Sequence, residues 1–125
     1  MLKQIIFVGL GGGIGSIFRF AVSKYAESKG GGVFPWATFT VNILGCLLIG
    51  VLFGFSAKQP WFDSNMKALF MTGFCGGFTT FSAFSLENVQ MYQSGNFPTL
   101  AVYVAMSIIV GFLAVYAGIA LTNLN

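Results

Sequence analysis

The sequence predicts an all-α integral membrane protein with four transmembrane helices. Hydrophobic residues make up 56% of the 125-residue chain and charged residues only 7%, whereas a soluble domain carries about a quarter charged residues. The mean hydropathy is +0.83, and the few charges fall between long apolar segments. This composition excludes a soluble enzyme, a disordered chain and a nucleic-acid-binding protein. The chain has no histidine, and we interpret Cys46 and Cys75 as small buried hydrophobic residues because both lie in apolar runs.

The charged residues divide the chain into four segments. Each segment is long enough for a membrane-spanning helix, which needs about 20 apolar residues. The predicted spans, which together form one domain, are residues 4–26, 37–55, 68–92 and 98–121. Short connectors rich in turn-forming residues separate them. A cleaved signal peptide is disfavoured because the first segment contains Arg19 and several glycines and because three further spans follow it.

The first predicted span is rich in glycine. Gly9 and Gly13, and likewise Gly11 and Gly15, are four residues apart, which is the spacing of close helix contacts in membranes, within or between subunits. No dinucleotide-binding register fits these glycines. Arg19, near the end of the span, would cost about 2.5–3.5 kcal/mol at a helix centre. Its long side chain either reaches the membrane interface or attracts anions into a vestibule, and the sequence leaves both interpretations open.

The second predicted span has its polar residues on one helical face. Thr38, Asn42 and Gly45 follow one another at spacings of four and three residues. The amide of Asn42 therefore either bonds to a neighbouring helix or lines a polar pathway, and the spacing favours neither. Gly50 and Gly54 repeat the close-contact spacing of the first span.

The third predicted span contains an unusual segment, Gly73–Ser85. Two adjacent glycines and two adjacent threonines weaken a helix there, and the segment is longer than a straight span needs. We therefore expect the third helix to be broken mid-membrane, near residues 76–80. Carbonyl groups that a break releases must face protein, water or an ion, and the negative end of the helix dipole favours a cation. A glycine kink absorbed by packing and by the threonine hydroxyls is the alternative.

Aromatic and hydroxyl side chains suggest a route for an anion. Phe81 and Phe84 are three residues apart and share a helical face. Packing or lipid contact is the ordinary role of such a pair, but the positive edges of aromatic rings can also attract a small anion. Tyr103 and Ser107 in the fourth span are four residues apart and could add hydroxyl donors to the same path.

The basic residues give almost no orientation bias. With four spans both termini lie on one side of the membrane, together with three lysines: Lys3, Lys58 and Lys67. The other side has Lys24 and Lys29, and also Arg19 if it reaches that interface. Such a chain can insert in both orientations, although one extra lysine can also fix a single topology. Because four helices leave no room for a wet pathway, we expect a transporter or channel of this size to oligomerise, and opposed orientations would give an antiparallel dimer.

Three runs of residues together resemble the bacterial Fluc (CrcB-type) fluoride channels. These runs are Gly76–Ser85, Asn42–Gly45 and Gly12–Arg19, and the resemblance extends over all four spans. It implies a dual-topology antiparallel homodimer with two pores in the plasma (inner) membrane of a bacterium. Such a channel would export cytoplasmic fluoride down its electrochemical gradient and so confer fluoride resistance.

The resemblance also implies particular site residues. A structural sodium ion at the dimer interface would be held by main-chain oxygens of Gly76 and Thr79 from both subunits, and Arg19 would lie in a vestibule. The pore residues would be Asn42, Phe81, Phe84, Tyr103 and Ser107, with Thr38 and Thr80 nearby. Ala83 departs from the family, which often has threonine between the two phenylalanines, so a hydroxyl contact is absent there.

Two other classes of membrane protein compete with a channel. Small multidrug-resistance-type drug/proton antiporters also form antiparallel dimers of four-helix chains, but they depend on an acidic residue in the first span. Here that span has Arg19, and Glu87, the only acidic candidate, lies near a helix end. A packing subunit of a larger complex would not need a Gly-Gly-x-Thr-Thr segment at mid-membrane depth. Passive conduction is therefore the expected activity, and we expect no enzymatic one.

Overall fold

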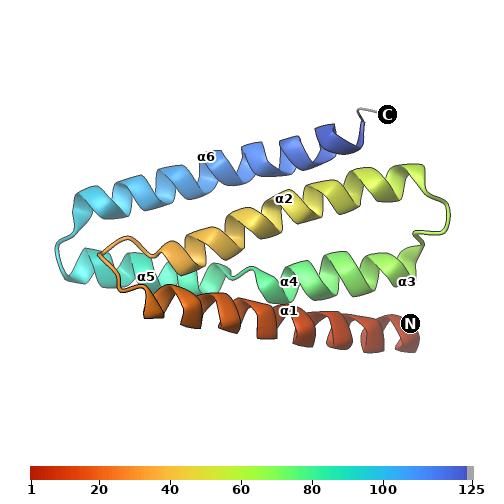
Figure 1. Ribbon diagram of the computed structural model, residues 1–125, viewed down its shortest axis with the longest axis horizontal. Coiled ribbons are helices and arrows are strands. Elements are labelled where there is room, and N and C mark those ends of the chain that lie inside the picture. The colour runs from red at the N-terminus through yellow and green to blue at the C-terminus, as the bar shows by residue number, and fades with distance from the viewer. Residues whose placement is uncertain (124–125) are drawn as a thin grey trace.

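The structure, a computed structural model, describes residues 1–123. Four long helical rods lie side by side and alternate in direction, so that the chain begins and ends at the same end of the bundle (Figure 1). In the described part of the chain, four helices are long and apolar enough to cross a membrane. This confirms the predicted all-helical class with four spans.

The first, second and fourth rods are continuous helices with turn-forming residues at their ends. They are α1 (Leu2–Ser28), α2 (Trp36–Lys58) and α6 (Phe97–Thr122). Gly30 follows α1 with φ +75° and Gly95 precedes α6 with φ +78°, a conformation that favours glycine. Proline lies just before α2 and in the first turn of α6, where its missing N–H costs no hydrogen bond.

The third rod is composed of four shorter pieces. They are α3 (Ser64–Lys67), the π-helical η1 (Ala68–Cys75), α4 (Gly76–Phe78) and α5 (Phe81–Gln93). The Asp63 side chain caps the start by accepting hydrogen bonds from two backbone N–H groups. Between α4 and α5, Thr79 (φ −88°, ψ 161°) and Thr80 (φ −151°, ψ 112°) are extended. We call these two residues the interruption.

The rods pack as two pairs, and glycine sets the distance within the first. α1 lies on η1 and α4, and α2 lies on α6 (Figure 1). A Cβ atom on Gly11 or Gly15 would collide with a backbone carbonyl, of Leu69 or Phe74 respectively. Gly9 and Gly13 have no atom within 4 Å of such a Cβ, because a two-residue offset turns them to the opposite face of α1. The predicted close contact is therefore confirmed within the chain for one glycine pair alone.

Glycine also brings α2 and α6 together. A Cβ atom on Gly50 would collide with the carbonyl oxygen of Val115, and one on Gly54 would collide with the Thr122 side chain. The predicted contact role of this pair is confirmed. Gly118 on α6 reciprocates, because its Cβ would meet the Leu47 carbonyl. The two helices thus approach backbone to backbone, as small residues allow in membranes.

Few side chains are fully buried within the chain. Cys75 is buried and Cys46 half-buried, and both are free thiols. The prediction of a buried residue is therefore confirmed for Cys75 and only in part for Cys46.

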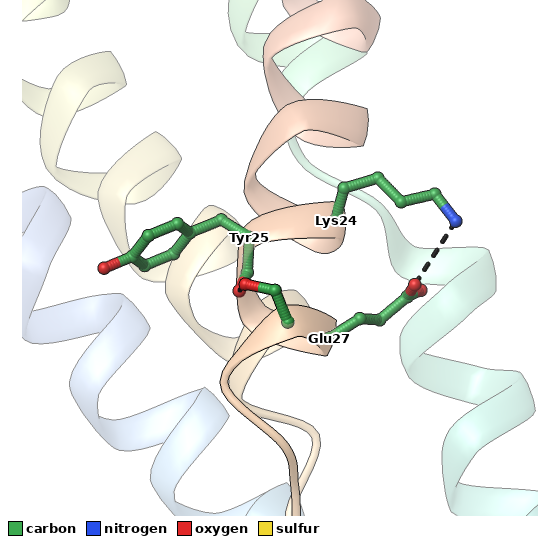
Figure 2. Close-up of polar contacts among 4 residues, drawn as sticks. Lys24, Tyr25 and Glu27 are labelled. Atoms are coloured by element: carbon green, nitrogen blue, oxygen red, sulfur yellow. Dashed lines mark hydrogen bonds and ion pairs between the residues drawn. The ribbon is translucent and has the colours of Figure 1, made fainter.

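An exposed ion pair lies at the end of α1. Lys24 pairs with Glu27 at 3.2 Å, and Tyr25 is turned to the other side of the helix (Figure 2). Such an exposed pair contributes little stability.

Candidate functional site

A cavity of about 520 Å³ opens where α2, the third rod and α6 meet. Seven of the predicted site residues line it: Asn42, Gly76, Thr79, Thr80, Phe81, Phe84 and Ser107. Of the described residues that form its wall, none is charged, and most are apolar. The structure therefore brings the majority of the predicted site together on one face of the chain, whereas Arg19, Thr38 and Tyr103 lie outside this wall.

Asn42 holds the interruption by both ends of its amide. Its Oδ1 accepts a hydrogen bond from the Thr80 N–H at 2.8 Å, and its Nδ2 donates to the Thr80 carbonyl at 3.2 Å. The amide thus pairs with Thr80 as a neighbouring strand would. One of the two Nδ2 hydrogens remains for another acceptor. Of the two roles left open for Asn42, the bond to a neighbouring span is therefore present, and it leaves one N–H of this cavity-lining residue unused.

The interruption withdraws the helical donors from several carbonyl groups, among them those of Gly76 and Thr79. A continuous α-helix would give the Thr80 N–H to the Gly76 carbonyl and the Ala83 N–H to the Thr79 carbonyl. Here the Thr80 N–H donates to Asn42, and the Ala83 N–H donates to Thr80 Oγ1 at 3.1 Å. Gly76 also faces open space, with no atom within 4 Å of the place of a Cβ.

These carbonyl groups suit a monovalent cation better than a multivalent one. They are neutral oxygens, and in residues 1–123 no group of three Cys, Asp or Glu side chains gathers to hold a metal. Two carbonyls from each of two subunits would supply four oxygens, fewer than the six to eight that calcium takes. The Thr79 hydroxyl donates to the Cys75 carbonyl at 2.9 Å, which holds this side chain against the preceding turn.

Arg19 contacts α4, the short helix that directly precedes the interruption. Its Nε donates to the Gly77 carbonyl at 2.9 Å, and the residue is half-buried. From the sequence alone, the Arg19 side chain either reaches the membrane interface or attracts anions into a vestibule. The structure adds a third role, a hydrogen bond to the backbone, which the 58-residue separation of the two partners hides from any local pattern.

Glu87 gathers two of the predicted pore hydroxyls. Thr38 Oγ1 donates to Glu87 Oε2 at 2.6 Å, and the Tyr103 hydroxyl donates to Glu87 Oε1 at 2.8 Å. Tyr103 is 0% exposed. Sequence reasoning set Glu87 aside because of its place near a helix end. The sequence does contain one signal for Glu87. It is an ionisable residue in a membrane-spanning segment, and such residues almost always have partners.

Phe81 and Phe84 form a short aromatic row along the cavity. Their ring centroids are 5.9 Å apart, and those of Phe84 and Tyr103 are 4.9 Å apart. The planes are tilted at 39° and 55°, so ring edges and not only faces are presented to neighbours. Phe81 is 79% exposed on the single chain, which leaves most of its surface free for contact with something other than its own fold.

The fold and the site together define a small multi-pass membrane protein built around an uncharged, amide- and hydroxyl-bearing cavity beside an interrupted helix. Comparison with known proteins makes the class specific. The chain belongs to the family described as CrcB-like protein, Camphor Resistance (CrcB), whose model matches residues 6–119. The resemblance that the sequence motifs predicted is thereby confirmed.

Relatives of this chain carry a functional name. The fluoride-specific ion channel FluC of Azobacteroides pseudotrichonymphae is 55% identical to it over 98% of both chains. Its counterpart in Flavobacterium psychrophilum is 41% identical, again over 98% of both chains. That of Leptospira interrogans is 42% identical over 94% of this chain and 92% of its own. The similarity thus extends through all four spans.

Proposed function

We propose that the protein is a fluoride-selective passive channel that exports cytoplasmic fluoride and so confers fluoride resistance. The observation that carries this proposal is the full-length similarity, up to 55% identity, to proteins named fluoride-specific ion channels. The uncharged cavity supports it independently. The protein is a transporter and not an enzyme.

The side chains along the cavity suit a small, strongly hydrated anion. Entry into a narrow path requires donors that replace water but do not hold the ion too tightly to leave. Asn42 offers its remaining N–H, Ser107 a hydroxyl, and Phe81 and Phe84 their positive ring edges. Thr38 and Tyr103 continue this track outside the cavity wall, where their hydroxyls donate to Glu87. The Thr80 hydroxyl accepts a hydrogen bond from the Ala83 N–H at the start of α5.

The driving force needs no coupled reaction. A potential of 100 mV, negative inside, favours exit of a monovalent anion by about 2.3 kcal/mol. This corresponds to a roughly 50-fold lower concentration inside at equilibrium. An open fluoride pore in the inner membrane of a bacterium would therefore suffice for resistance.

The working unit in this proposal is an antiparallel homodimer with two pores. The cavity opens on the outer face of the single chain, with Phe81 largely exposed and Gly76 facing open space. A second copy would close the cavity and supply the other pore wall. The near-equal numbers of basic residues at the two ends of the bundle agree with insertion in both orientations.

The liposome experiment that tests this function compares anions. Purified protein in liposomes is expected to release fluoride rapidly and chloride slowly, without any added energy source. Proton flux driven by a cationic drug, with no fluoride release, would instead support the drug/proton antiporter. Release of neither would contradict both functions.

A structural sodium ion held by the Gly76 and Thr79 carbonyls is part of the proposal. Replacing sodium by a larger organic cation on both sides of the liposome membrane is expected to slow or abolish fluoride release. Thr79→Ser should be mild, because the ligand is main-chain and serine keeps the hydroxyl that bonds to Cys75. Unchanged fluoride release and unchanged dimer stability without sodium would contradict the proposed structural sodium ion.

Dual topology gives a separate expectation. Reporter fusions at the C-terminus are expected to be active on both sides of the membrane when one gene is expressed, because neither end of the bundle carries a clear excess of basic residues. Adding two lysines beside Lys3 should shift the population toward one orientation. A single clean orientation of the unaltered chain would contradict the antiparallel dimer.

A further inference from the structure

We propose that Arg19 is a positioning residue that fixes the interruption of the third span through the Gly77 carbonyl, and that it acts through this hydrogen bond and not through its charge. The inference rests on the proposed channel function. Its starting point is the contact from Arg19 Nε to the Gly77 oxygen, 2.9 Å long and half-buried between α1 and α4.

The Gly77 carbonyl needs a donor from outside its own helix. In a continuous α-helix it would accept from the Phe81 N–H. The extended Thr79 and Thr80 carry that N–H away, because α4 ends at Phe78 and α5 begins at Phe81. A carbonyl left unbonded within a membrane costs several kcal/mol. Arg19 Nε supplies the missing donor.

The packing of α1 brings Arg19 to this carbonyl. Gly15, one turn before Arg19, lies so close to the third rod that a Cβ there would be 2.9 Å from the Phe78 nitrogen. Gly12 lies against Gly77, whose own Cβ would collide with the Gly12 carbonyl. This approach explains why the inner nitrogen of the guanidinium, and not its outer ones, meets the backbone.

Arg19 and Asn42 hold the interruption from two sides. Arg19 fixes Gly77, directly after the proposed sodium ligand Gly76, and Asn42 fixes Thr80, directly after the proposed ligand Thr79. Each proposed ligand is therefore followed by a residue anchored to a different span. Loss of the Arg19 bond frees the Gly77 peptide and with it the direction of the neighbouring Gly76 carbonyl.

Three substitutions separate the hydrogen bond from the charge. Glutamine places a neutral N–H donor at the same position along the side chain as arginine Nε. Lysine keeps the charge but has a methylene at that position, and methionine has neither donor nor charge. The experiment measures fluoride release from liposomes and the sodium-dependent rise in melting temperature for Arg19→Gln, Arg19→Lys and Arg19→Met.

The positioning role predicts a particular order. Arg19→Gln should keep fluoride release within about threefold of the unaltered protein and keep its sodium-dependent stabilisation. Arg19→Lys and Arg19→Met should each lose about tenfold or more in release, the scale of leaving a buried acceptor without its donor. Both should also need more sodium for the same rise in melting temperature.

Other outcomes overturn the inference. If Arg19→Lys released fluoride about as fast as the unaltered protein, and Arg19→Gln released it as slowly as Arg19→Met, the role of Arg19 would lie in its charge and in anion attraction. Equal fluoride release and equal sodium-dependent stabilisation in all three variants would show that the Arg19 hydrogen bond has no positioning role. If the unaltered protein releases no fluoride, the proposed function itself fails. Amide hydrogen exchange across residues 77–83 then decides: faster exchange in the lysine and methionine variants than in the glutamine variant supports the bond, and equal exchange refutes it.

Discussion

Replacing Phe81 or Phe84 with isoleucine is expected to lower fluoride release by at least about tenfold while the purified protein elutes as the unaltered protein does. Isoleucine keeps most of the apolar volume, and such swaps usually cost less than about 1.5 kcal/mol in packing. What it removes is the positive ring edge that can meet an anion. Phe81 is suited to this test because its ring is 79% exposed on its own chain and contributes little to the fold of the single subunit.

The matched control is a phenylalanine that faces away from the cavity. Phe53 on α2 is 55% exposed and does not line the cavity, so Phe53→Ile should leave release unchanged. Phe78, although near in sequence, is unsuitable because it is 8% exposed and stacks on Phe74 at 5.7 Å. Full release by both Phe81→Ile and Phe84→Ile would place the pore elsewhere.

Gly15→Ala is expected to prevent normal folding, whereas Gly13→Ala on the same helix should be tolerated. The new Cβ at residue 15 would collide with the Phe74 carbonyl and lie 2.9 Å from the Phe78 nitrogen, and neither backbone atom can move aside alone. Overpacking commonly costs about 1–3 kcal/mol, and a backbone clash belongs at or above that range. At residue 13 the Cβ meets no atom of the chain, and alanine favours a helix by about 0.5–1 kcal/mol over glycine.

Melting temperature and size-exclusion elution in detergent measure this pair of variants. We expect opposite signs in the single subunit: a large loss for Gly15→Ala and a small change or gain for Gly13→Ala. Elution of Gly13→Ala as a smaller species with an unchanged melting temperature would instead assign that glycine to a contact between subunits. A well-folded Gly15→Ala variant would contradict the close approach of α1 to the third rod.

Composition and local pattern were sufficient to predict the helical framework. The predicted span of residues 37–55 lies within α2, and the Gly-Gly-x-Thr-Thr segment falls where the structure has the extended pair Thr79 and Thr80. Both are local consequences of hydropathy and of weak helix formers. The π-helical geometry of η1 could not be predicted, because Ala68–Cys75 has an ordinary apolar sequence and its conformation depends on packing against α1.

The partners of the candidate site were beyond local pattern for a different reason. Asn42 meets Thr80 across 38 residues, Thr38 meets Glu87 across 49, and Arg19 meets Gly77 across 58. Spacing along one helix shows which side chains share a face but not which backbone group lies opposite. The sequence therefore named Asn42 and Arg19 as site residues and left their partners undetermined.

The placement of these partners has a consequence for biogenesis. The interruption is held by Arg19 on α1, by Asn42 on α2 and by Thr80 itself, all of which precede α5 in the chain. A nascent chain emerging N-terminus first therefore already carries every side chain needed to shape its third span before the last helix leaves the ribosome. Deletion of the last span should spare this local geometry, whereas a permuted chain that begins at α2 would have to insert its third span before Arg19 has been synthesised.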